Sequence, residues 1–438
     1  MSKLQELIQR LCPDGVEYKP LGEVGTFTRG NGLQKKDFTE SGVGCIHYGQ
    51  IYTYYGTVAY ETKSFVSSEL SKKLLKVNPG DLVIACTSEN VEDVGKAVAW
   101  LGKSEIVTGG HSVVFRHTLN PKYVAYFFQT QMFFSQKKRF AYGAKVIDIR
   151  TNDLARIVIP VPPVEVQEEI VKILDRFADY AAELQAELQA RKQQYEYYRN
   201  LLLTFNPSAC GCGTDDDQQI GVTAWGGDSY KIHWKKLGDI MDICRGASPR
   251  PIRNFLTSSE NGIPWIKIGD VSPNSKYIIS TAQFITHEGV AKSRLLKKGD
   301  FILSNSMSFG RPYILNIDGC IHDGWVALSN YQPSFNADFL YHLLKSDFIQ
   351  KYWQKKAGQG GAVSNLNSEI IASTLIPIPP LEVQERIVAI LDRFETLVND
   401  LNEGLPREIE LRRKQYEHYR DRLLAFPDIS RPGTKQRI

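Results

Sequence analysis

The feature that most constrains this chain is an eighteen-residue segment that occurs twice. "PVPPVEVQEEIVKILDRF" fills residues 160–177 and "PIPPLEVQERIVAILDRF" fills residues 377–394, with fourteen of the eighteen positions identical at an offset of 217. Prolines followed by glutamates are typical of a helix N-terminus, because proline preorganises the first turn and acidic side chains offset the helix dipole. A chain of 438 residues is long enough for two to four domains. The repeat therefore predicts one structural plan used twice.

The repeat extends beyond this helix opening. Further matching segments are "EYKPLGEVGTFTRG" (17–30) with "HWKKLGDIMDICRG" (233–246), "NPGDLVI" (78–84) with "KKGDFIL" (297–303), "GAKVIDIRTNDLARIVIP" (143–160) with "GGAVSNLNSEIIASTLIP" (360–377), and "RKQQYEYYRNLLLTF" (191–205) with "RRKQYEHYRDRLLAF" (412–426). Each half is thus a block of about 150 residues followed by a long helix. Short β-rich runs such as 81–85 and 301–304, and one helical stretch at 121–140 or 336–356, predict mixed α/β blocks.

Each long helix carries an apolar seam with heptad spacing. The first seam runs through Phe177, Ala181, Leu184, Leu188, Arg191, Tyr195, Tyr198, Leu202 and Phe205. The second runs through Ile387, Leu391, Phe394, Val398, Leu401, Leu405, Ile409, Arg412, Tyr416, Tyr419, Leu423 and Phe426. Two successive steps of four residues, from Leu401 to Leu405 and from Leu405 to Ile409, predict a coiled-coil stutter. Gly404 and Pro406 lie at the same place, so a kink in the helix is an equally good prediction. Each helix has one obvious partner in this chain, the other helix.

The predicted fold class is α+β: two mixed α/β domains joined by two long antiparallel coiled-coil helices, in a circular repeat with pseudo-two-fold symmetry. The N-terminal helix takes the place before the first domain that the long helix takes before the second. The predicted boundaries are 1–12 for the N-terminal helix, 13–160 for the first domain, 161–206 for the central spacer helix, 207–229 for a linker, 230–377 for the second domain, 378–426 for the C-terminal spacer helix and 427–438 for a tail.

The net charge of +4 conceals an alternation along the chain. Residues 1–160 hold 20 Lys and Arg against 15 Asp and Glu, and residues 230–377 hold 17 against 11. Residues 161–229 are acidic, with 5 against 12, and residues 378–438 balance at 11 against 11. Two basic domains on non-basic connectors indicate two contacts to a polyanion. No apolar run approaches the roughly 18 residues of a membrane span, so the expected location is the cytoplasm and no membrane contact is expected.

Motifs of catalysis and metal binding are missing. The sequence has neither a phosphate-binding Gly-x-x-x-x-Gly-Lys-Ser/Thr loop nor a Gly-x-Ser-x-Gly elbow. Cys210 and Cys212 lack a second ligand pair at zinc spacing, so no metal site is predicted. What remains is recognition, since both domains hold Gly-rich polar loops with Arg, Lys, Asn, Gln and aromatic residues. The loops differ between domains while the helices match, which indicates two readers of different targets on a common spacer.

The chain resembles the specificity subunits of Type I restriction–modification systems. "IPVPPVEVQEEIVKILDRF" with "RKQQYEYYRNLLLTF", and "IPIPPLEVQERIVAILDRF" with "RRKQYEHYRDRLLAF", carry the resemblance, and "CPDGVEYKPLGEV" (12–24) and "NGIPWIKIGDV" (261–271) are similar to the openings and cores of that family's target recognition domains. The resemblance covers essentially the whole chain. The resemblance implies two target recognition domains, each reading one half of an asymmetric, bipartite double-stranded DNA sequence, and helices that set the half-site spacing.

The same resemblance implies partners and cofactors. Two methyltransferase subunits would dock on the helices, bring S-adenosylmethionine and modify adenine, and endonuclease–translocase subunits would add ATP- and Mg²⁺-dependent cleavage. This chain itself is expected to bind no cofactor and to be non-catalytic. The alternative from another class is a coiled-coil scaffold whose globular ends bind proteins instead of DNA, and it would show a flat salt dependence in DNA binding.

These considerations select candidate residues. Phosphate contacts are expected from Lys35, Lys36, Lys137, Lys138, Lys145, Lys355 and Lys356. Base-edge candidates are Arg29, Asn31, Gln34, Tyr48, Gln50, Ser88 and Asn90 in the first domain, and Arg245, Ser248, Arg250, Arg253, Asp270, Ser306, Ser308, Arg311 and Gln359 in the second. The helix pair and partner interface is assigned to Phe177, Leu184, Leu188, Tyr195, Tyr198, Phe394, Leu401, Tyr416 and Tyr419.

Overall fold

The computed structural model describes residues 2–205, 220–224, 228–258, 261–271, 275–305, 309–358, 365–400 and 404–429. The chain folds as two compact units, Met1–Leu184 with Ile409–Ile438, and Gln185–Glu408. Each unit combines one predicted domain with parts of both long helices, and the finer domain boundaries stay predictions. The predicted site residues Ser306, Ser308, Gln359 and Leu401, and the cysteines Cys210 and Cys212, lie outside the described residues.

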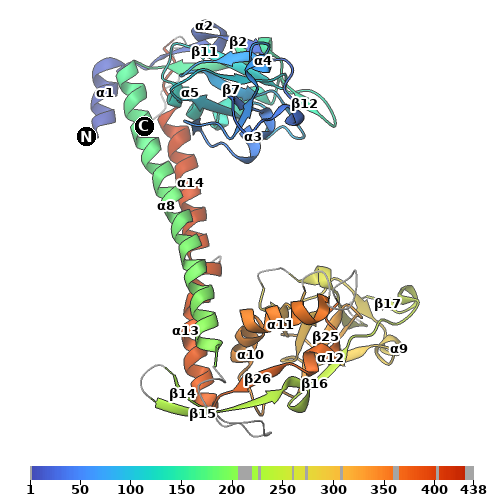
Figure 1. Ribbon diagram of the computed structural model, residues 1–438. Coiled ribbons are helices and arrows are strands. Elements are labelled where there is room, and N and C mark those ends of the chain that lie inside the picture. Colours follow the sequence, from blue (N-terminus) through green and yellow to red (C-terminus); the bar gives the residue numbers. More distant parts are fainter. Residues whose placement is uncertain are drawn as a thin grey trace. The chain divides into compact units, whose positions relative to one another are not determined.

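The first unit is built on two sheets (Figure 1). Its strands are β1 Glu17–Pro20, β2 Gly25–Arg29, β3 Val43–Ile46, β4 Val58–Ala59, β5 Ser64–Val66, β6 Leu75–Val77, β7 Leu82–Ala85, β8 Thr87–Ser88, β9 Ala97–Trp100, β10 Ile106–Thr108, β11 Ser112–His117, β12 Ile147–Asp148 and β13 Val158–Val161. Five strands pair in the order β2–β11–β7–β9–β4 and four in the order β5–β3–β10–β6. The short pairs β1–β13 and β8–β12 complete the unit.

The second unit repeats this strand order. Its strands are β14 Ile220–Ala224, β15 Asp228–Lys236, β16 Asp242–Arg245, β17 Leu256–Thr257, β18 Ile263–Ile266, β19 Tyr277–Ile278, β20 Phe284–Ile285, β21 Arg294–Leu296, β22 Phe301–Ser304, β23 Pro312–Leu315, β24 Gly319–Ile321, β25 Trp325–Ser329 and β26 Leu375–Ile378. One sheet has the order β16–β25–β22–β23–β19, and a second has β17–β20–β18–β24–β21. A third, β14–β15–β26, contains the counterpart of β1–β13. The predicted internal repeat of mixed α/β domains is therefore confirmed.

The repeated Gly–Asp pair makes the same turn into the central strand of each domain. Gly80 and Gly299 adopt φ angles of +95° and +97°, which a residue with a Cβ rarely adopts. Each glycine N–H donates to a backbone carbonyl at 2.7 Å. The carboxylates of Asp81 and Asp300 each accept the backbone N–H of the residue three positions earlier, at 2.8 Å. The turn chemistry is thus encoded locally, which explains why both halves have glycine and aspartate at these two positions.

Short helices cover the sheets. They are α2 Leu21–Val24, α3 Tyr48–Thr53, α4 Ser68–Ser71, α5 Pro121–Phe127, α6 Gln131–Lys137, α7 Thr151–Ala155, α9 His287–Val290, α10 Ala337–Leu344, α11 Asp347–Ala357 and α12 Ser368–Ala372. The prediction of one helical stretch at 121–140 and at 336–356 is wrong, because each stretch is two helices. At both breaks a hydroxyl residue, Thr130 or Ser346, takes the N-cap position of the second helix and donates its side-chain proton to the carbonyl three residues earlier.

The first long helix, α8 Val164–Leu203, is continuous for 40 residues, close to the predicted length. The second is interrupted, with α13 ending at Asn399 and α14 beginning at Leu405, as Leu381–Asn399 and Leu405–Leu423. Of the two alternatives for the second helix, the structure therefore has the break and not a smooth stutter. A Cβ at Gly404 would collide with the carbonyl oxygen of Thr396, so glycine is needed at this position. None of the helices in the described residues is both long and apolar enough to cross a lipid bilayer.

The predicted heptad seam of α8 is confirmed by burial. All nine seam positions from Phe177 to Phe205 are buried or half-buried, and Leu184, Leu188 and Tyr195 are among the buried ones. Most of the remaining positions between 178 and 190 are exposed. In the second helix, Phe394 and Tyr416 are half-buried and Tyr419 keeps 39% of its surface exposed. One stripe of α8 therefore faces partners along its whole length.

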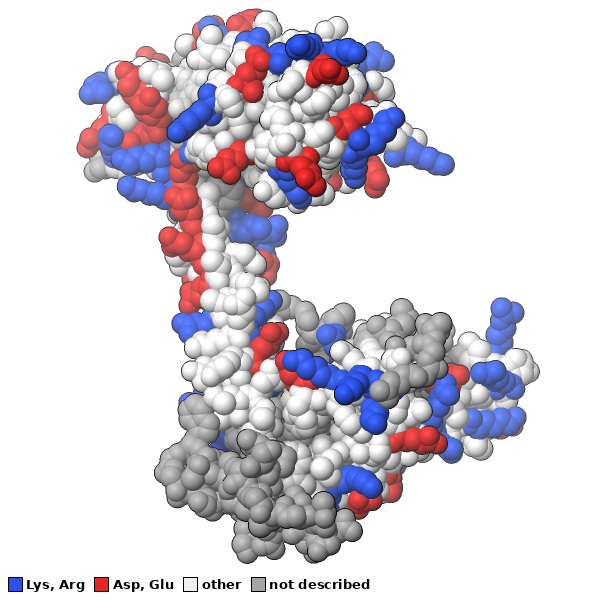
Figure 2. All heavy atoms as spheres, in the orientation of Figure 1, with Lys and Arg blue, Asp and Glu red and all other residues white. Residues whose placement is uncertain are grey.

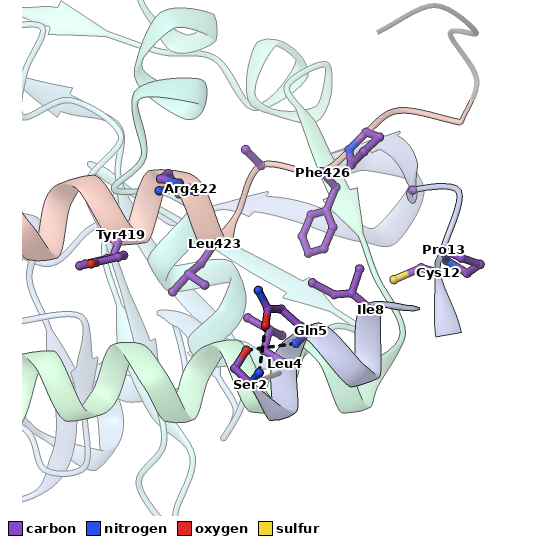
Figure 3. Close-up of a pocket in the computed structure, with 13 residues that line it drawn as sticks. Ser2, Leu4, Gln5, Ile8, Cys12, Pro13, Tyr419, Arg422, Leu423 and Phe426 are labelled. Atoms are coloured by element: carbon purple, nitrogen blue, oxygen red, sulfur yellow. Dashed lines mark hydrogen bonds between the residues drawn. The ribbon is translucent and has the colours of Figure 1, made fainter. Parts of the chain in front are cut away.

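The N-terminal helix, α1 Lys3–Leu11, packs into the core of the first unit. Leu4 belongs to the same buried cluster as Val166 and Ile170 of α8 and as Leu424 and Phe426 after α14. Ser2 and Gln5 form a capping box, drawn as dashed lines in Figure 3. A mainly apolar hollow of about 320 Å³ lies between α1 and the end of α14, and Figure 3 draws the residues that line it. The N-terminal segment thus covers the end of the C-terminal helix.

Candidate nucleic-acid interface

The glycine of the repeated Arg–Gly pair allows two backbone segments to approach closely in each domain. A Cβ at Gly30, directly after β2, would collide with the carbonyl oxygen of Gly109. A Cβ at Gly246, directly after β16, would collide with the carbonyl oxygen of His322 in the same way. Gly109 follows β10 directly and His322 follows β24 directly, and both strands are interior strands of the other sheet of their domain. Glycine is therefore required at both positions by the same contact, and no side chain is tolerated there without a backbone shift.

The arginine of the pair holds the neighbouring loop. The Nε atom of Arg29 donates to the carbonyl oxygen of Gly110 at 3.4 Å, and the Nε atom of Arg245 donates to the carbonyl oxygen of Asp323 at 3.0 Å. Both arginines are exposed at the surface. The two domains therefore present the same arginine from the same frame, and what differs is the set of side chains around it.

In the first domain, Asp148 is the centre of a polar cluster. Its carboxylate accepts two hydrogen bonds from the Arg29 guanidinium, at 2.9 and 3.4 Å, and one from the Thr87 hydroxyl at 2.9 Å. Tyr142 contacts it at 3.4 Å, and a ring nitrogen of His111 lies 3.2 Å from the Thr87 oxygen. The hydrogen bond that Arg29 donates to Asp148 raises the pKa of Arg29 above its usual value. Arg29 is thus a fixed, permanently charged group that keeps 41% of its side chain exposed.

The predicted residues of the first domain fall into two classes. Those exposed to solvent are Arg29, Asn31, Gln34, Lys35, Lys36, Asn90, Lys138 and Lys145. Tyr48 is half-buried and its ring lies 4.8 Å from that of His111. Gln50 is also half-buried, and its amide is already engaged with Ser64 at 2.6 Å and with a backbone N–H at 3.1 Å. Ser88 is 9% exposed. The exposed group and Tyr48 therefore remain the better candidates for DNA contact.

The position of Lys137 in the structure disagrees with the phosphate contact that was predicted for it. It is only 3% exposed, and its ammonium donates to the backbone carbonyls of Glu92 and Val94 at 2.8 and 2.6 Å. Desolvation lowers its pKa to about 8. Position 137 lies on the inner face of α6, so the side chain anchors the loop 89–95 from inside the domain. A phosphate therefore has no access to it, whereas the adjacent Lys138 is exposed.

In the second domain, Asp323 is the carboxylate at the centre of the polar cluster, and its partners differ from those of Asp148. Its carboxylate accepts the Ser248 hydroxyl at 2.7 Å and contacts the Arg250 guanidinium at 3.4 Å. These residues form one wall of an open hollow of about 600 Å³, which we call the Asp323 hollow. Its lining consists of Ser248, Pro249, Arg250, Ile252, Arg253, Leu256, Trp265, Lys267, Gln283, His322 and Asp323. Three predicted base-edge residues thus surround one concave site.

Asp270 has a structural role in place of the predicted base contact. Its carboxylate accepts the backbone N–H groups of Lys267 and Ala282, at 2.8 and 3.2 Å, and shares the Thr281 hydroxyl proton, at 2.9 Å, with the Trp265 carbonyl. These bonds hold the 3₁₀ turn η5 Ile268–Asp270 against the segment that precedes β20. With three donors already on two oxygens, Asp270 organises this loop and has little capacity left for a cytosine amino group.

The other predicted residues of the second domain are placed as follows. Arg245, Arg250, Arg253, Lys355 and Lys356 are exposed, and Ser248 and Arg311 are half-buried. Sequence reasoning missed Asp148 in the first domain, and Gln283 and Asp323 in the second. Asp323 lies in "HDG" between two β-rich runs, a turn signal that was available in the sequence. Asp148 and Gln283 have no comparable sequence signal, because their place in the candidate site depends on residues that are distant in the chain.

Figure 2 shows how charge is distributed on one face. Lysine and arginine side chains are interspersed with acidic ones over the first domain, and they gather at the end of the second domain where Figure 1 places β17 and α9. The Asp323 hollow borders β17 through Leu256, and its lining holds three cationic side chains against one carboxylate. The charge excess counted in the sequence is therefore partly local in the second domain.

The helix pair carries two equivalent aromatic contacts, one in each unit. Phe177 stacks on Tyr419 in the first unit, with ring centroids 5.5 Å apart and an interplanar angle of 24°. Tyr198 stacks on Phe394 in the second unit at 5.5 Å and 23°. Phe177 and Phe394 are the ends of the repeated helix opening, and the two tyrosines occupy matching places in the other repeated segment. The predicted pseudo-two-fold relation thus reaches individual side chains.

A second repeated contact joins the helices to the domains, but with different chemistry. Tyr126 donates to Asp175 at 2.6 Å in the first unit, whereas in the second His342 lies 3.0 Å from Asp392. His342 is fully buried, and burial lowers its pKa. His342, Asp392 and Glu395 lie within 4.8 Å of one another. Lysine ammonium groups already contact both carboxylates, at 3.6 and 3.2 Å, so the group is a charge network.

Comparison with known proteins agrees with this repeated architecture. The family model for the Type I restriction modification DNA specificity domain matches the chain twice, over residues 13–191 and 231–411. The chain is 31% identical over 424 residues to a putative type I restriction enzyme specificity subunit of Haemophilus influenzae, covering 94% of this chain and 96% of that protein. It is 34% identical over 287 residues to a type I restriction enzyme specificity subunit of Escherichia coli, covering 62% of this chain and 63% of that subunit.

Solved structures share the fold. A chain from a structure of an assembled type I R-M system superposes with a TM-score of 0.64 at 18% identity, over 94% of this chain and 98% of that chain. The HsdS subunit from Thermoanaerobacter tengcongensis superposes with a TM-score of 0.52 at 18% identity, over 94% of this chain and 96% of that subunit. Two family matches that together span most of the sequence, and a fold repeated in the same way, establish that the chain belongs to the family of Type I restriction–modification specificity subunits.

Proposed function

We propose that each domain of this chain reads one half of a bipartite, asymmetric DNA sequence. The observation that carries the proposal is the contrast between a shared frame and unlike surfaces. Both domains have the same central strand order and the same Arg–Gly contact. Around that arginine, the first domain has the Asp148 cluster, and the second has the Asp323 hollow. A palindromic target would need two identical readers, so unlike surfaces favour an asymmetric target.

The paired helices are proposed to fix the half-site spacing and to dock two identical methyltransferase subunits. Support comes from the matching aromatic stacks at 5.5 Å, because each unit then offers an equivalent helical surface. Exposed apolar side chains on these helices, such as Tyr197 at 63% and Leu411 at 48%, are available to a partner. S-adenosylmethionine, ATP and Mg²⁺ are assigned to the methyltransferase and endonuclease–translocase partners, and the chain itself to recognition without catalysis. The cytoplasmic location stays a prediction.

An exchange of domains tests the half-site assignment. Residues 13–160 are replaced by the corresponding block of another family member, and the complex with the methyltransferase partners is mapped for methylated sites at base resolution. The expected result is a changed sequence in one half of the target and an unchanged sequence in the other half. A change in both halves, or in neither, would contradict the proposal.

The spacing role is tested in α8. About four residues, one helical turn of ~5.4 Å, are added or removed between Ala178 and Ala190, where most side chains outside the seam are exposed. The expected result is a different number of base pairs between two unchanged half-sites. An unchanged spacing would show that α8 does not act as the ruler. A flat salt dependence of DNA binding by the complex would instead favour a protein-binding scaffold.

A further inference from the structure

The Asp323 hollow is built from three segments that are distant in the sequence. One is the loop between β16 and β17, which contributes Ser248, Arg250 and Arg253. The second pairs the end of β18 with the segment before β20, and contributes Trp265, Lys267 and Gln283. The third is the turn between β24 and β25 with His322 and Asp323. Trp265 is 2% exposed, so its ring belongs to the floor and is not free to move.

Some polar groups of the hollow are already used within the protein. The Asp323 carboxylate receives Ser248 and Arg250, as described above. The two ring nitrogens of His322 lie 3.2 and 2.7 Å from the backbone N–H groups of Ile268 and Gly324. A neutral imidazole accepts through one nitrogen only, so one of these two N–H groups is hydrogen-bonded to His322 at a time, and the contacts hold that wall of the hollow.

Three other lining side chains have no protein partner among the described residues. Neither the amide of Gln283, the ammonium of Lys267 nor the guanidinium of Arg253 makes a hydrogen bond or ion pair with any residue that the structure describes. Gln283 and Lys267 are half-buried, and Arg253 is exposed. A half-buried donor without a partner has given up part of its hydration, so it gains more from a ligand than a fully solvated donor does.

The backbone beneath Gln283 and Lys267 is held rigidly. The Trp265 N–H donates to the Gln283 carbonyl at 2.8 Å, and the Thr281 hydroxyl oxygen lies 2.7 Å from the Trp265 carbonyl oxygen and 2.9 Å from the Asp270 carboxylate, so its one proton serves these two acceptors in turn. Asp270 accepts the Lys267 N–H at 2.8 Å. Asp270 thus ties the backbone of Lys267 to that of Ala282, the neighbour of Gln283. Preorganised donors lose less conformational entropy when they bind.

We propose that the Asp323 hollow is where the second domain reads base edges, with Gln283 and Lys267 as specificity-determining residues. The proposal rests on the proposed function and refines it. A glutamine amide offers one donor and one acceptor, which match adenine N6 and N7, and a lysine donates to guanine O6 and N7. Arg253, exposed at the rim, contacts a phosphate of the same strand. Neither Gln283 nor Lys267 was among the residues expected from the sequence.

The test uses the full chain in complex with its methyltransferase partners. Gln283→Ala, Gln283→Glu and Lys267→Ala are each mapped for methylated sites, with Lys298→Ala as control. Lys298 is an exposed lysine of the same domain, in the turn before β22 and outside the hollow. Each test variant is expected to relax or change the preference at one base pair of the half read by the second domain, by about 5- to 150-fold. The first half and the control are expected to keep the parental sequence.

Three results would overturn this assignment. The first is an unchanged target for both Gln283→Ala and Lys267→Ala. The second is a uniform loss of binding at every sequence, which is the result expected for a phosphate contact. The third is a change in the first half of the target. The domain exchange of residues 13–160, run in parallel, separates this failure from failure of the proposed function. If that exchange changes one half-site while the point variants change nothing, half-site reading stands and only the placement in the hollow is wrong.

Discussion

The glutamine of the repeated helix opening ties each long helix to its domain, and it allows a quantitative prediction. Gln384 is fully buried; its side-chain oxygen accepts the Asn336 N–H at 2.8 Å, and its nitrogen donates to the carbonyls of Ser334 and Pro379 at 2.9 and 2.8 Å. The equivalent Gln167 is 3% exposed and makes only two such bonds. These join it to Asn120 N–H at 2.9 Å and to Pro162 O at 2.8 Å.

We expect Gln384→Met to destabilise the second unit by about 3–9 kcal/mol. Methionine has a similar volume but leaves one buried and two partly buried backbone groups without this partner, at up to about 1–3 kcal/mol each. Gln167→Met leaves two groups unsatisfied in the first unit, and the same rule predicts about 2–6 kcal/mol. Because a domain is stable by only about 5–15 kcal/mol, Gln384→Met should bring the second unit close to unfolding at room temperature.

Urea titration followed by hydrogen exchange resolved by segment measures the two units separately. Tryptophan fluorescence adds a probe of the second unit, which contains five of the six tryptophans. The matched control is Glu385→Met on the exposed face of the same helix, for which a change within about 0.5 kcal/mol is expected. A cost below about 1 kcal/mol for Gln384→Met, or a larger cost for Gln167→Met than for Gln384→Met, would refute the reasoning.

Three further predictions follow from individual contacts. Burial lowers the pKa of His342 below its ordinary value of 6.5, so the unfolded chain takes up a proton first on acidification and the second unit loses stability below about pH 6.5. His342→Tyr, which copies the first unit's hydrogen bond to aspartate, should flatten thermal unfolding temperature against pH; an equally steep profile would contradict this. Gly246→Ala should cost about 1–3 kcal/mol in denaturant unfolding, because its Cβ meets a backbone carbonyl, and a neutral result would mean that the loop yields freely. Lys138→Ala should lower the slope of log binding constant against log salt by about 0.9 in the partner complex, and an unchanged slope would remove Lys138 from the phosphate contacts.

Much of the fold follows from local sequence patterns. Every seam position of α8 predicted from Phe177 to Phe205 is buried or half-buried, because burial along a long helix repeats with the helical period. The Gly–Asp turns at 80–81 and 299–300 were visible as repeats, because their geometry depends on adjacent residues. The breaks at Thr130 and Ser346 were missed, since each hydroxyl is also compatible with the interior of a helix.

The candidate site was less predictable. Lys137 and Lys138 are adjacent lysines in one basic run, yet one is sealed beneath the loop 89–95 and the other is exposed. Asp270 has the residue type of a base reader, but its carboxylate is occupied by donors from across the loop. Burial and hydrogen-bond saturation of a loop residue depend on segments far away in the chain, so composition alone does not report them.

The sequence by itself determined that one plan is used twice, that two long helices carry apolar seams, and that the chain resembles Type I specificity subunits. These properties depend on residue spacing and on internal identity, which are local and repeated. Only the tertiary structure decided which side chains of the loops are free to meet DNA. It joins Asp148 to Arg29 and brings Gln283 and Lys267 beside Asp323, because pairing of distant strands sets those distances.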